Sequence, residues 1–283
     1  MSQSTGMRVR VQAWALALAI VVVTTLPAAA AEVAVPRAAY TLQAQVQGEG
    51  PMAVVFESGF GQGAVAWNAV IEGLGPECRC IAYGRAGLGD SGTDGNAKTI
   101  DEHLADLDAV IATLAPGRKV LLVGHSYGGL LVSEFARKHP GRMQGLVLVD
   151  PTTMGQRHAF RQANPARVEA DDAMLLSMLP PAMAAHYRAL MVQLDSAEAA
   201  TPRVMPDVPV VLLTATQVAA EPFVFEETAQ GKELWRTQHG ALFAQFSRGT
   251  HRYLDTGHDL HDENPGAVVD AIREVAATAS ATD

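Results

Sequence analysis

A serine in a glycine-rich turn is the residue of this sequence best suited to act as a nucleophile. Ser126 is the central residue of a G-x-S-x-G motif that spans residues 124–128. An apolar run precedes the motif and a helical pattern follows it, so a strained turn between strand and helix is expected to expose the hydroxyl. The glycines leave room for strand and helix to approach closely. The backbone N–H of Tyr127, at the helix start, would face developing negative charge and serve as an oxyanion donor.

A base for this serine is expected near the end of the sequence. His258 follows Gly257 in a short loop before the last helical pattern. A neutral imidazole, with an ordinary pKa of about 6.5, can both accept and return a proton near pH 7. His261, three residues further on, is the competing candidate. His125 is next to Ser126 in sequence, but adjacent side chains diverge on such a turn, and this favours a packing role.

The carboxylate that would orient the histidine has more than one candidate. Asp150 directly follows the apolar run at 146–149, and functional groups gather at the carboxyl ends of parallel strands. It lies one helix and one strand after Ser126, which brings it back beside the serine. Asp150 could instead cap a helix start before Pro151. The alternative acid is Glu221, the first carboxylate after the run at 208–214, and further candidates are Glu226, Asp255 and Asp259.

These motifs resemble the α/β-hydrolase superfamily, especially its lipase, esterase and peroxidase-like members with a GHSxGG turn. The resemblance extends from about Met52 to Ala277. Residues 54–61 occupy the place of the superfamily's oxyanion turn, with Ser58-Gly59-Phe60 where His-Gly-x is common. Because the donor there is a backbone N–H, the resemblance implies Phe60 as the second oxyanion donor. It also implies an acid at Asp150, the position used by some lipases and dehalogenases.

A second glycine-rich segment, Tyr83 to Ser91, is similar to the superfamily's D-R-x-G-x-G-x-S turn. Gly84 stands where Asp is usual. We interpret this segment as scaffold, because its glycines permit a tight loop and Arg85 can anchor it.

The remaining elements must bring these residues together. Apolar runs typical of buried parallel strands alternate with helical patterns. The expected strands are 52–56, 80–83, 120–123, 146–149 and 208–214, and the expected helices are 101–114, 128–138 and 268–277. This alternation predicts an α/β fold with a mostly parallel central sheet covered by helices on both faces. The segment from about 151 to 206 has helical spacing and no strand-like run, which predicts a small helical cap inserted between two strands.

The amino terminus has the pattern of a secretory signal peptide. Arg8 and Arg10 precede an uncharged apolar run, and small residues follow Pro27. We therefore expect a signal at 1–31, a hydrolase domain at 32–283, and a periplasmic or secreted protein. A retained membrane anchor is the other interpretation, so membrane association is expected only if the segment is kept.

Composition excludes several classes of protein. Hydrophobic residues make up 48% of the chain and charged residues 18%, which fits a packed globular domain. The net charge is −9 and becomes more negative without Arg8 and Arg10, so nucleic acid is not an expected partner. Cys78 and Cys80 are too few for a structural zinc site, and we expect neither a metal nor a cofactor.

The combined patterns predict a serine hydrolase with a small-molecule substrate. The substrate they favour is an apolar carboxylic ester. Ser126 would form the acyl intermediate, with His258 as base and Asp150 as acid. Two alternatives are open. One is a non-catalytic ligand-binding protein on a hydrolase shell, and the other is an aminopeptidase-like amide hydrolase that would use Glu169, Asp171 or Asp172 to hold a substrate amine.

Overall fold

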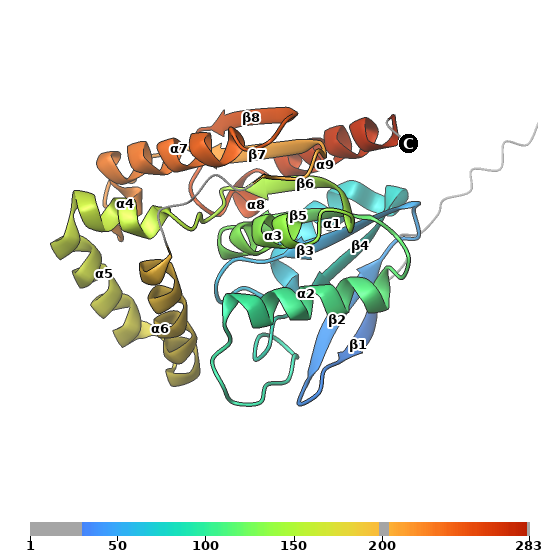
Figure 1. Cartoon of the computed structure of the whole chain (residues 1–283), viewed down its shortest axis with the longest axis horizontal. Helices are drawn as coiled ribbons and strands as arrows, with labels where there is room; N and C mark the ends of the chain where they lie inside the picture. The colour runs from blue at the N-terminus through green and yellow to red at the C-terminus, as the bar shows by residue number, and fades with distance from the viewer. Residues whose placement is uncertain (1–29, 198–203, 282–283) are drawn as a thin grey trace, which may run out of the picture.

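The computed structural model describes residues 30–197 and 204–281, and within them eight strands form one sheet (Figure 1). The strand order is β1-β2-β4-β3-β5-β6-β7-β8, and all neighbours from β4 to β8 are parallel. Only the β1–β2 and β2–β4 pairs are antiparallel. The strands are β1 (Ala31–Pro36), β2 (Thr41–Gln47), β3 (Met52–Glu57), β4 (Cys78–Tyr83), β5 (Val120–His125), β6 (Met143–Val149), β7 (Val210–Ala215) and β8 (Gly249–Leu254).

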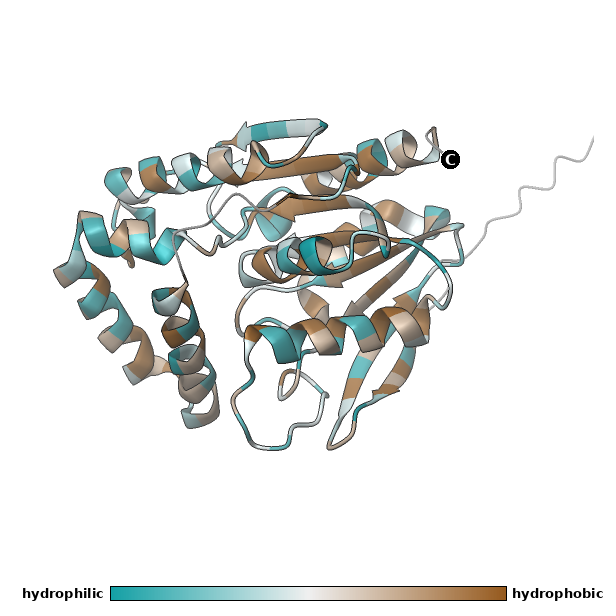
Figure 2. Cartoon of the chain, viewed as in Figure 1, coloured by the Kyte–Doolittle hydropathy of each residue, from teal (hydrophilic) through white to brown (hydrophobic). Residues whose placement is uncertain are grey.

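Helices cover both faces of this sheet, which confirms the predicted fold class. Successive residues of the central strands point to opposite faces, so Leu121 and Leu122 belong to separate apolar clusters. The helices α2 (Ile100–Leu114) and α3 (Tyr127–Lys138) cover one face, and α1 (Asn68–Leu74) and α9 (Pro265–Ser280) cover the other. In Figure 2 the central strands are brown, that is hydrophobic, and lie between helices of mixed colour. Because every residue of β5 and β7 is buried, the sequence has near-continuous apolar runs there.

Among the described residues between β6 and β7, three helices interrupt the alternation of strands and helices. They are α4 (Gln156–Ala163), α5 (Pro165–Met178) and α6 (Pro181–Ser196), and they stand beside the carboxyl end of the sheet in Figure 1. Asn164 caps the start of α5, whose first residue is Pro165. The remaining short and long helices of the described residues are η1 (Ala64–Trp67), η2 (Gly75–Glu77), η3 (Phe225–Glu227), α7 (Ala229–Phe243) and α8 (Leu260–Glu263).

The strands β1, β2 and β8 were not predicted, and their sequences explain why. In β1 only Val35 is buried. In β2 apolar residues alternate with polar ones, so that only Leu42, Ala44 and Val46 are buried. In β8 no residue is buried, because it is an edge strand rich in polar side chains. Continuous apolar runs mark strands that are buried on both faces, and strands buried on one face or on none lack such runs.

The predicted signal segment lies outside the described residues except for Ala30 and Ala31, and Ala31 pairs with Val46 in the first hairpin. Within the described ranges no helix is both long and apolar enough to cross a membrane. Cys78 and Cys80 are both buried in β4 and both free.

We predict that Gly128→Ala destabilises the fold, because a Cβ there would lie 2.1 Å from the backbone oxygen of Glu57. Strand β3 and helix α3 would have to move apart, and overpacking of this kind costs about 1–3 kcal/mol. Urea unfolding measures the loss. Gly141→Ala is the matched control, because its added methyl group would meet no described heavy atom within 4 Å. Equal stabilities of the two variants would contradict the close approach.

Candidate active site

Ser126 occupies a strained turn between β5 and α3. Its φ of 51° and ψ of −121° are unfavourable for a residue with a side chain. Backbone hydrogen bonds hold the turn in place: the Ser126 N–H donates to Val149 O at 3.1 Å, and the Thr152 N–H donates to Ser126 O at 2.9 Å. The neighbouring strand β6 and its following loop therefore fix the serine above the carboxyl end of the sheet.

His258 lies in the loop between β8 and α8 and contacts both other predicted residues of the site. Its Nε2 is 2.9 Å from Ser126 Oγ, and its Nδ1 is 2.6 Å from Asp150 Oδ2. The structure thus brings together Ser126, His258 and Asp150, which lie far apart in sequence. When the ring is neutral and its Nδ1–H donates to the carboxylate, Nε2 is free to accept the serine proton.

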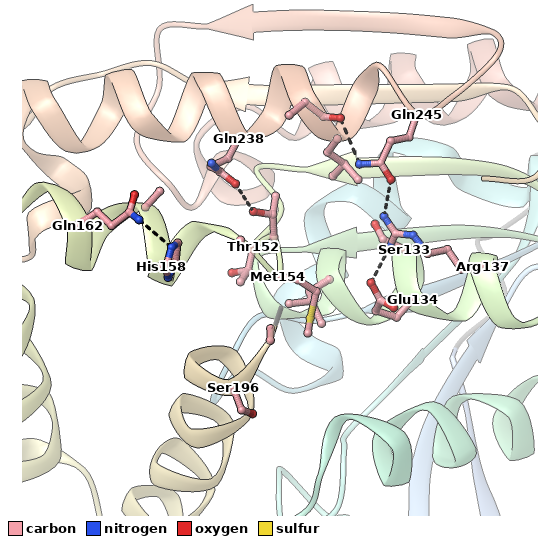
Figure 3. A pocket seen from close by; sticks show the side chains of 17 residues that line it. Ser133, Glu134, Arg137, Thr152, Met154, His158, Gln162, Ser196, Gln238 and Gln245 are labelled. Atoms are coloured by element: carbon pink, nitrogen blue, oxygen red, sulfur yellow. Dashed lines mark hydrogen bonds and ion pairs between the residues drawn. The ribbon is translucent and has the colours of Figure 1, made fainter. Parts of the chain in front are cut away.

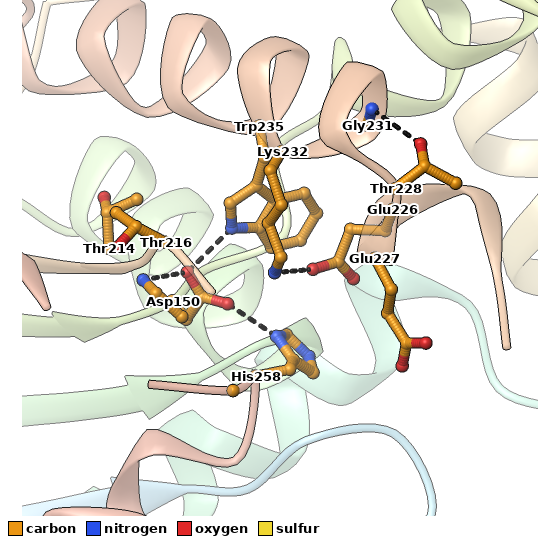
Figure 4. Close-up of polar contacts among 12 residues, drawn as sticks. Asp150, Thr214, Thr216, Glu226, Glu227, Thr228, Gly231, Lys232, Trp235 and His258 are labelled. Atoms are coloured by element: carbon orange, nitrogen blue, oxygen red, sulfur yellow. Dashed lines mark hydrogen bonds and ion pairs between the residues drawn. The ribbon is translucent and has the colours of Figure 1, made fainter. Parts of the chain in front are cut away.

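Asp150 is fully buried directly after β6, where its φ of 42° is again unusual. Its Oδ1 accepts hydrogen bonds from the Ala215 N–H at 2.8 Å and from Trp235 Nε1–H at 2.7 Å, while Oδ2 faces His258 (Figure 4). Burial raises the pKa of Asp150, but the hydrogen bond and charge of His258 outweigh it and lower the pKa below its ordinary value. The carboxylate therefore stays ionised at neutral pH.

The alternatives considered for base and acid lie elsewhere. His261 is completely buried, with its ring centroid 4.2 Å from that of His125 and 5.1 Å from that of Trp67. Glu221 is exposed in the loop after β7. Asp259 accepts a hydrogen bond from Gln62 and not from His258, its neighbour in sequence. Of these candidates, only Glu226 approaches the His258 ring, and it does so without replacing Asp150.

Glu226 and Trp235 also lie close to the His258 ring. The Trp235 ring meets the His258 ring edge to face at 5.6 Å. Desolvation lowers the pKa of His258, but the charge of Glu226 and the hydrogen bond and charge of Asp150 raise it, with a net result of about 9. Lys232 opposes the rise. The sequence offered Glu226 only as a further candidate for the acid. It gave no reason to single out Lys232, because the helix α7 that carries this residue was not among the expected helices.

Phe60 and Tyr127, the predicted oxyanion donors, line the same pocket as Ser126. Tyr127 is the first residue of α3, and N–H groups in the first turn of a helix have no partner within the helix. The Phe60 N–H shares a peptide unit with the Gly59 carbonyl, which accepts a hydrogen bond from Arg85 at 2.5 Å. Because the peptide is trans, holding its oxygen on one side turns the N–H toward the other.

The structure gives Arg85 a wider role than the sequence predicted. It does not merely anchor its own glycine-rich loop: it is buried against the turn after β3, where it donates to Ser58 O at 2.6 Å and pairs with Glu57 at 2.6 Å. A charged Glu57 at the end of an otherwise apolar strand was the available signal, since a buried acid requires a partner.

A pocket of about 270 Å³ opens beside Ser126, between the sheet and the helices α4–α6. Most of its lining is apolar or aromatic, including Phe60, Phe160, Leu190 and Met191. A larger cavity of about 530 Å³ lies between α3, α4 and α7 and is lined by Ser133, Glu134, His158, Gln238 and Gln245 among others (Figure 3). It shares Thr152 with the smaller pocket, but Ser126 lines only the smaller one, so we assign the chemistry to the smaller pocket.

The absence of a metal or cofactor stays a prediction. Among the described residues, two groups bring possible ligand atoms within 4.8 Å of one another: Asp150 with Glu226 and His258, and His125 with Asp259 and His261. Asp150 already accepts three hydrogen bonds, one of them from His258, and Glu226 accepts one from Lys232 at 2.7 Å. His125 Nε2 lies 2.9 Å from the backbone oxygen of His258, so neither group presents three free ligand atoms.

Comparison with known proteins points to one family. The sequence model described as "Alpha/beta hydrolase family" matches residues 54–271. Among solved structures, a thermophilic esterase from Thermogutta terrifontis is similar with a TM-score of 0.63 and 20% identity, over 88% of this chain and 99% of that one. At this level of identity the likeness shows the fold alone.

Curated relatives are similar over a shorter stretch. The uncharacterized protein YqjL of Bacillus subtilis is 30% identical over 105 residues, which are 37% of this chain and 42% of that protein. The pimeloyl-[acyl-carrier protein] methyl ester esterase of Yersinia enterocolitica is 32% identical over 111 residues, 39% of this chain and 41% of that protein. The matched stretch spans less than half the length of these relatives.

We predict that Trp235→Phe costs about 1.5–3 kcal/mol of stability, because the ionised Asp150 loses a buried hydrogen bond. Trp67→Phe is the matched control: Trp67 is equally buried, but its Nε1–H donates to the neutral hydroxyl of Ser58 at 3.0 Å. That bond is expected to contribute about 0.5–1.5 kcal/mol. Urea unfolding at pH 7 compares the two, and an equal or larger loss in Trp67→Phe would contradict an ionised Asp150.

Proposed function

The chain belongs to the alpha/beta hydrolase family, and on this premise we propose that it is a serine hydrolase that cleaves carboxylic esters through an acyl-Ser126 intermediate. The observation that carries the proposal is the contact of His258 with Ser126 Oγ on one ring nitrogen and with the buried Asp150 on the other. A strained serine that faces a pocket and a histidine has no evident structural use, and this favours a catalytic role over a passive one.

In the proposed reaction, His258 Nε2 takes the Ser126 proton while Oγ forms a bond to the ester carbonyl carbon. The N–H groups of Phe60 and Tyr127 stabilise the resulting oxyanion. His258, now an imidazolium held by Asp150, gives the proton to the leaving alkoxide, which departs as the alcohol. A water molecule then repeats the sequence on the acyl-serine: His258 takes its proton while the hydroxide adds to the carbonyl carbon. The imidazolium returns the proton to Ser126 Oγ as the bond from Oγ to the acyl carbon breaks, and the carboxylic acid leaves.

The pocket favours an apolar ester over a substrate with a free amine. Its acidic side chains are each paired with a basic one, as Asp171–Arg167, Asp172–Arg157 and Glu226–Lys232. No unpaired carboxylate among the described lining residues is therefore available to an ammonium group, and this argues against the aminopeptidase-like alternative. The name of the Yersinia relative, a methyl ester esterase, agrees with ester chemistry.

We predict that a fluorophosphonate probe labels the protein stoichiometrically at Ser126, and that Ser126→Ala and His258→Ala abolish the labelling. Asp150→Asn should fold but lose about 10⁴ in kcat toward a chromogenic ester, because the histidine tautomer is no longer fixed. Mass spectrometry and ester turnover measure these effects.

Glu221→Gln is the matched control for the acid and should turn over ester normally. An active Asp150→Asn together with an inactive Glu221→Gln would refute the assignment of Asp150. A folded protein that the probe does not modify would favour the non-catalytic ligand-binding alternative. Turnover of peptide but not ester substrates would favour amide hydrolysis.

We also propose that the hydrolase is exported, on the basis of the signal pattern at 1–31. We predict that the exported protein has lost this segment and begins near Glu32. The intact mass of the protein recovered from the periplasm or medium measures this. A mass that includes Met1–Ala31 would instead indicate a retained membrane anchor.

A further inference from the structure

A second carboxylate faces the proposed base from an element that the reaction scheme does not use. Glu226 belongs to η3, after β7, and one of its carboxylate oxygens lies within 4.8 Å of the facing atoms of both Asp150 and His258. Its side chain is 14% exposed and also lines the substrate pocket. Asp150 occupies Nδ1 of His258, so Glu226 is not a substitute acid.

A buried lysine holds Glu226 in this place. Lys232 on α7 is 1% exposed, and its Nζ donates to Glu226 Oε1 at 2.7 Å (Figure 4). Its ammonium also lies 5.8 Å from the centre of the Trp235 ring, which packs on His258. Burial of a lysine is costly unless an anion accompanies it, so the pair is not an incidental surface contact.

The charges around the proposed base balance in one protonation state. Asp150 and Glu226 contribute two negative charges and Lys232 one positive charge, so the group carries −1 with neutral His258 and zero with imidazolium. The imidazolium is the form of His258 that accompanies each tetrahedral intermediate in the proposed reaction. Loss of either Glu226 or Lys232 would disturb this balance in opposite directions.

The other titratable groups near His258 do not supply such a charge. Burial lowers the pKa of His125, whose Nε2 contacts the His258 backbone, and also that of His261, so both are neutral at pH 7. Burial lowers the pKa of His239, which faces Asp150 at 4.0 Å, to about 4. Asp259, on the same loop as His258, is 55% exposed and therefore screened by solvent.

We propose that Glu226 is a positioning residue that stabilises the imidazolium form of His258 by its charge, and that Lys232 fixes Glu226 and limits its effect. The inference rests on the proposed function, because it assumes that His258 is the base for Ser126. Its consequence is that the pair, together with Asp150, sets the lower pH limit of the enzyme. Since the base must be neutral and its pKa is raised to about 9, the rate is low at neutral pH and rises as the pH increases through that value.

The test is the pH dependence of inactivation by diisopropyl fluorophosphate, which requires neutral His258 but no knowledge of the natural substrate. The wild-type midpoint should lie above pH 7. In Glu226→Gln it should fall by about 1 pH unit or more, because an anion close to the ring is removed. Glu227→Gln is the matched control: it removes the same charge from the same short helix, but its carboxylate accepts from the Phe223 N–H. Its midpoint should equal that of the wild type.

Lys232→Met should move the midpoint upward, because Glu226 then faces the ring without its cation. If that variant does not fold, the double variant Glu226→Gln/Lys232→Met replaces the whole pair and avoids an unpaired buried charge. Its midpoint should lie between those of Glu226→Gln and the wild type, because the Glu226 effect exceeds that of Lys232.

The outcomes distinguish the inference on Glu226 from the proposed serine hydrolase function. If the wild type is inactivated at Ser126 but Glu226→Gln has an unchanged midpoint, the inference on Glu226 is wrong and the proposed function stands. A purely structural role would lower thermal stability without moving the midpoint, and this result also overturns the inference. If the wild type is not inactivated at any pH, the proposed function fails and the inference fails with it.

Discussion

The arrangement of the site depends on one buried anion. Asp150 has no contact with solvent, so its charge is tolerated only because donors from three other parts of the chain surround it. These are the backbone N–H at the end of β7, the indole of α7 and the imidazole of the loop after β8. Each donor is presented by an element that lies after the cap in sequence. The carboxylate therefore fixes the position of the carboxyl-terminal third of the domain relative to Ser126.

A buried ion pair, Arg85 with Glu57, fixes a second segment on the other side of Ser126. Arg85 is 3% exposed and Glu57 1%, and Tyr83 also donates its hydroxyl to Glu57. Removal of one partner of such a pair typically costs about 3–5 kcal/mol, so the pair commits β3 and the loop after β4 to a single arrangement. That arrangement holds the carbonyl of the Gly59–Phe60 peptide and thereby directs its N–H. One buried charge orients the histidine, and the other orients the peptide that faces the pocket.

Local sequence was sufficient for the central strands and for proposing Ser126 and His258, and it placed Asp150 among several candidates for the acid. Ser126 and Asp150 each end a buried apolar run, and parallel strands place such ends at one edge of the sheet. The strands β1, β2 and β8 were missed because burial on one face or on none leaves no continuous apolar run. Arg85 and Glu226 could not be assigned, because each acts on a segment far away in sequence: 26 residues separate Arg85 from Gly59, and a sequence pattern does not record which distant partner neutralises a charge. The choice between Asp150 and Glu221 likewise needed the position of the histidine ring.

The cap, formed by the helices α4, α5 and α6, is connected to the site through the segment that carries Glu226. Asp171 on α5 accepts a hydrogen bond from the Phe225 N–H at 2.6 Å, one residue before Glu226. Arg167, one turn earlier on α5, donates to the carbonyls of Pro222 and Phe223 and pairs with Asp171. The position of η3, and with it the distance of the Glu226 carboxylate from His258, is thus determined from the cap side as well as by Lys232 on α7. Because α5 also lines the pocket through Val168, Asp172 and Leu175, a substrate that displaces this helix would act on the charge balance around the base.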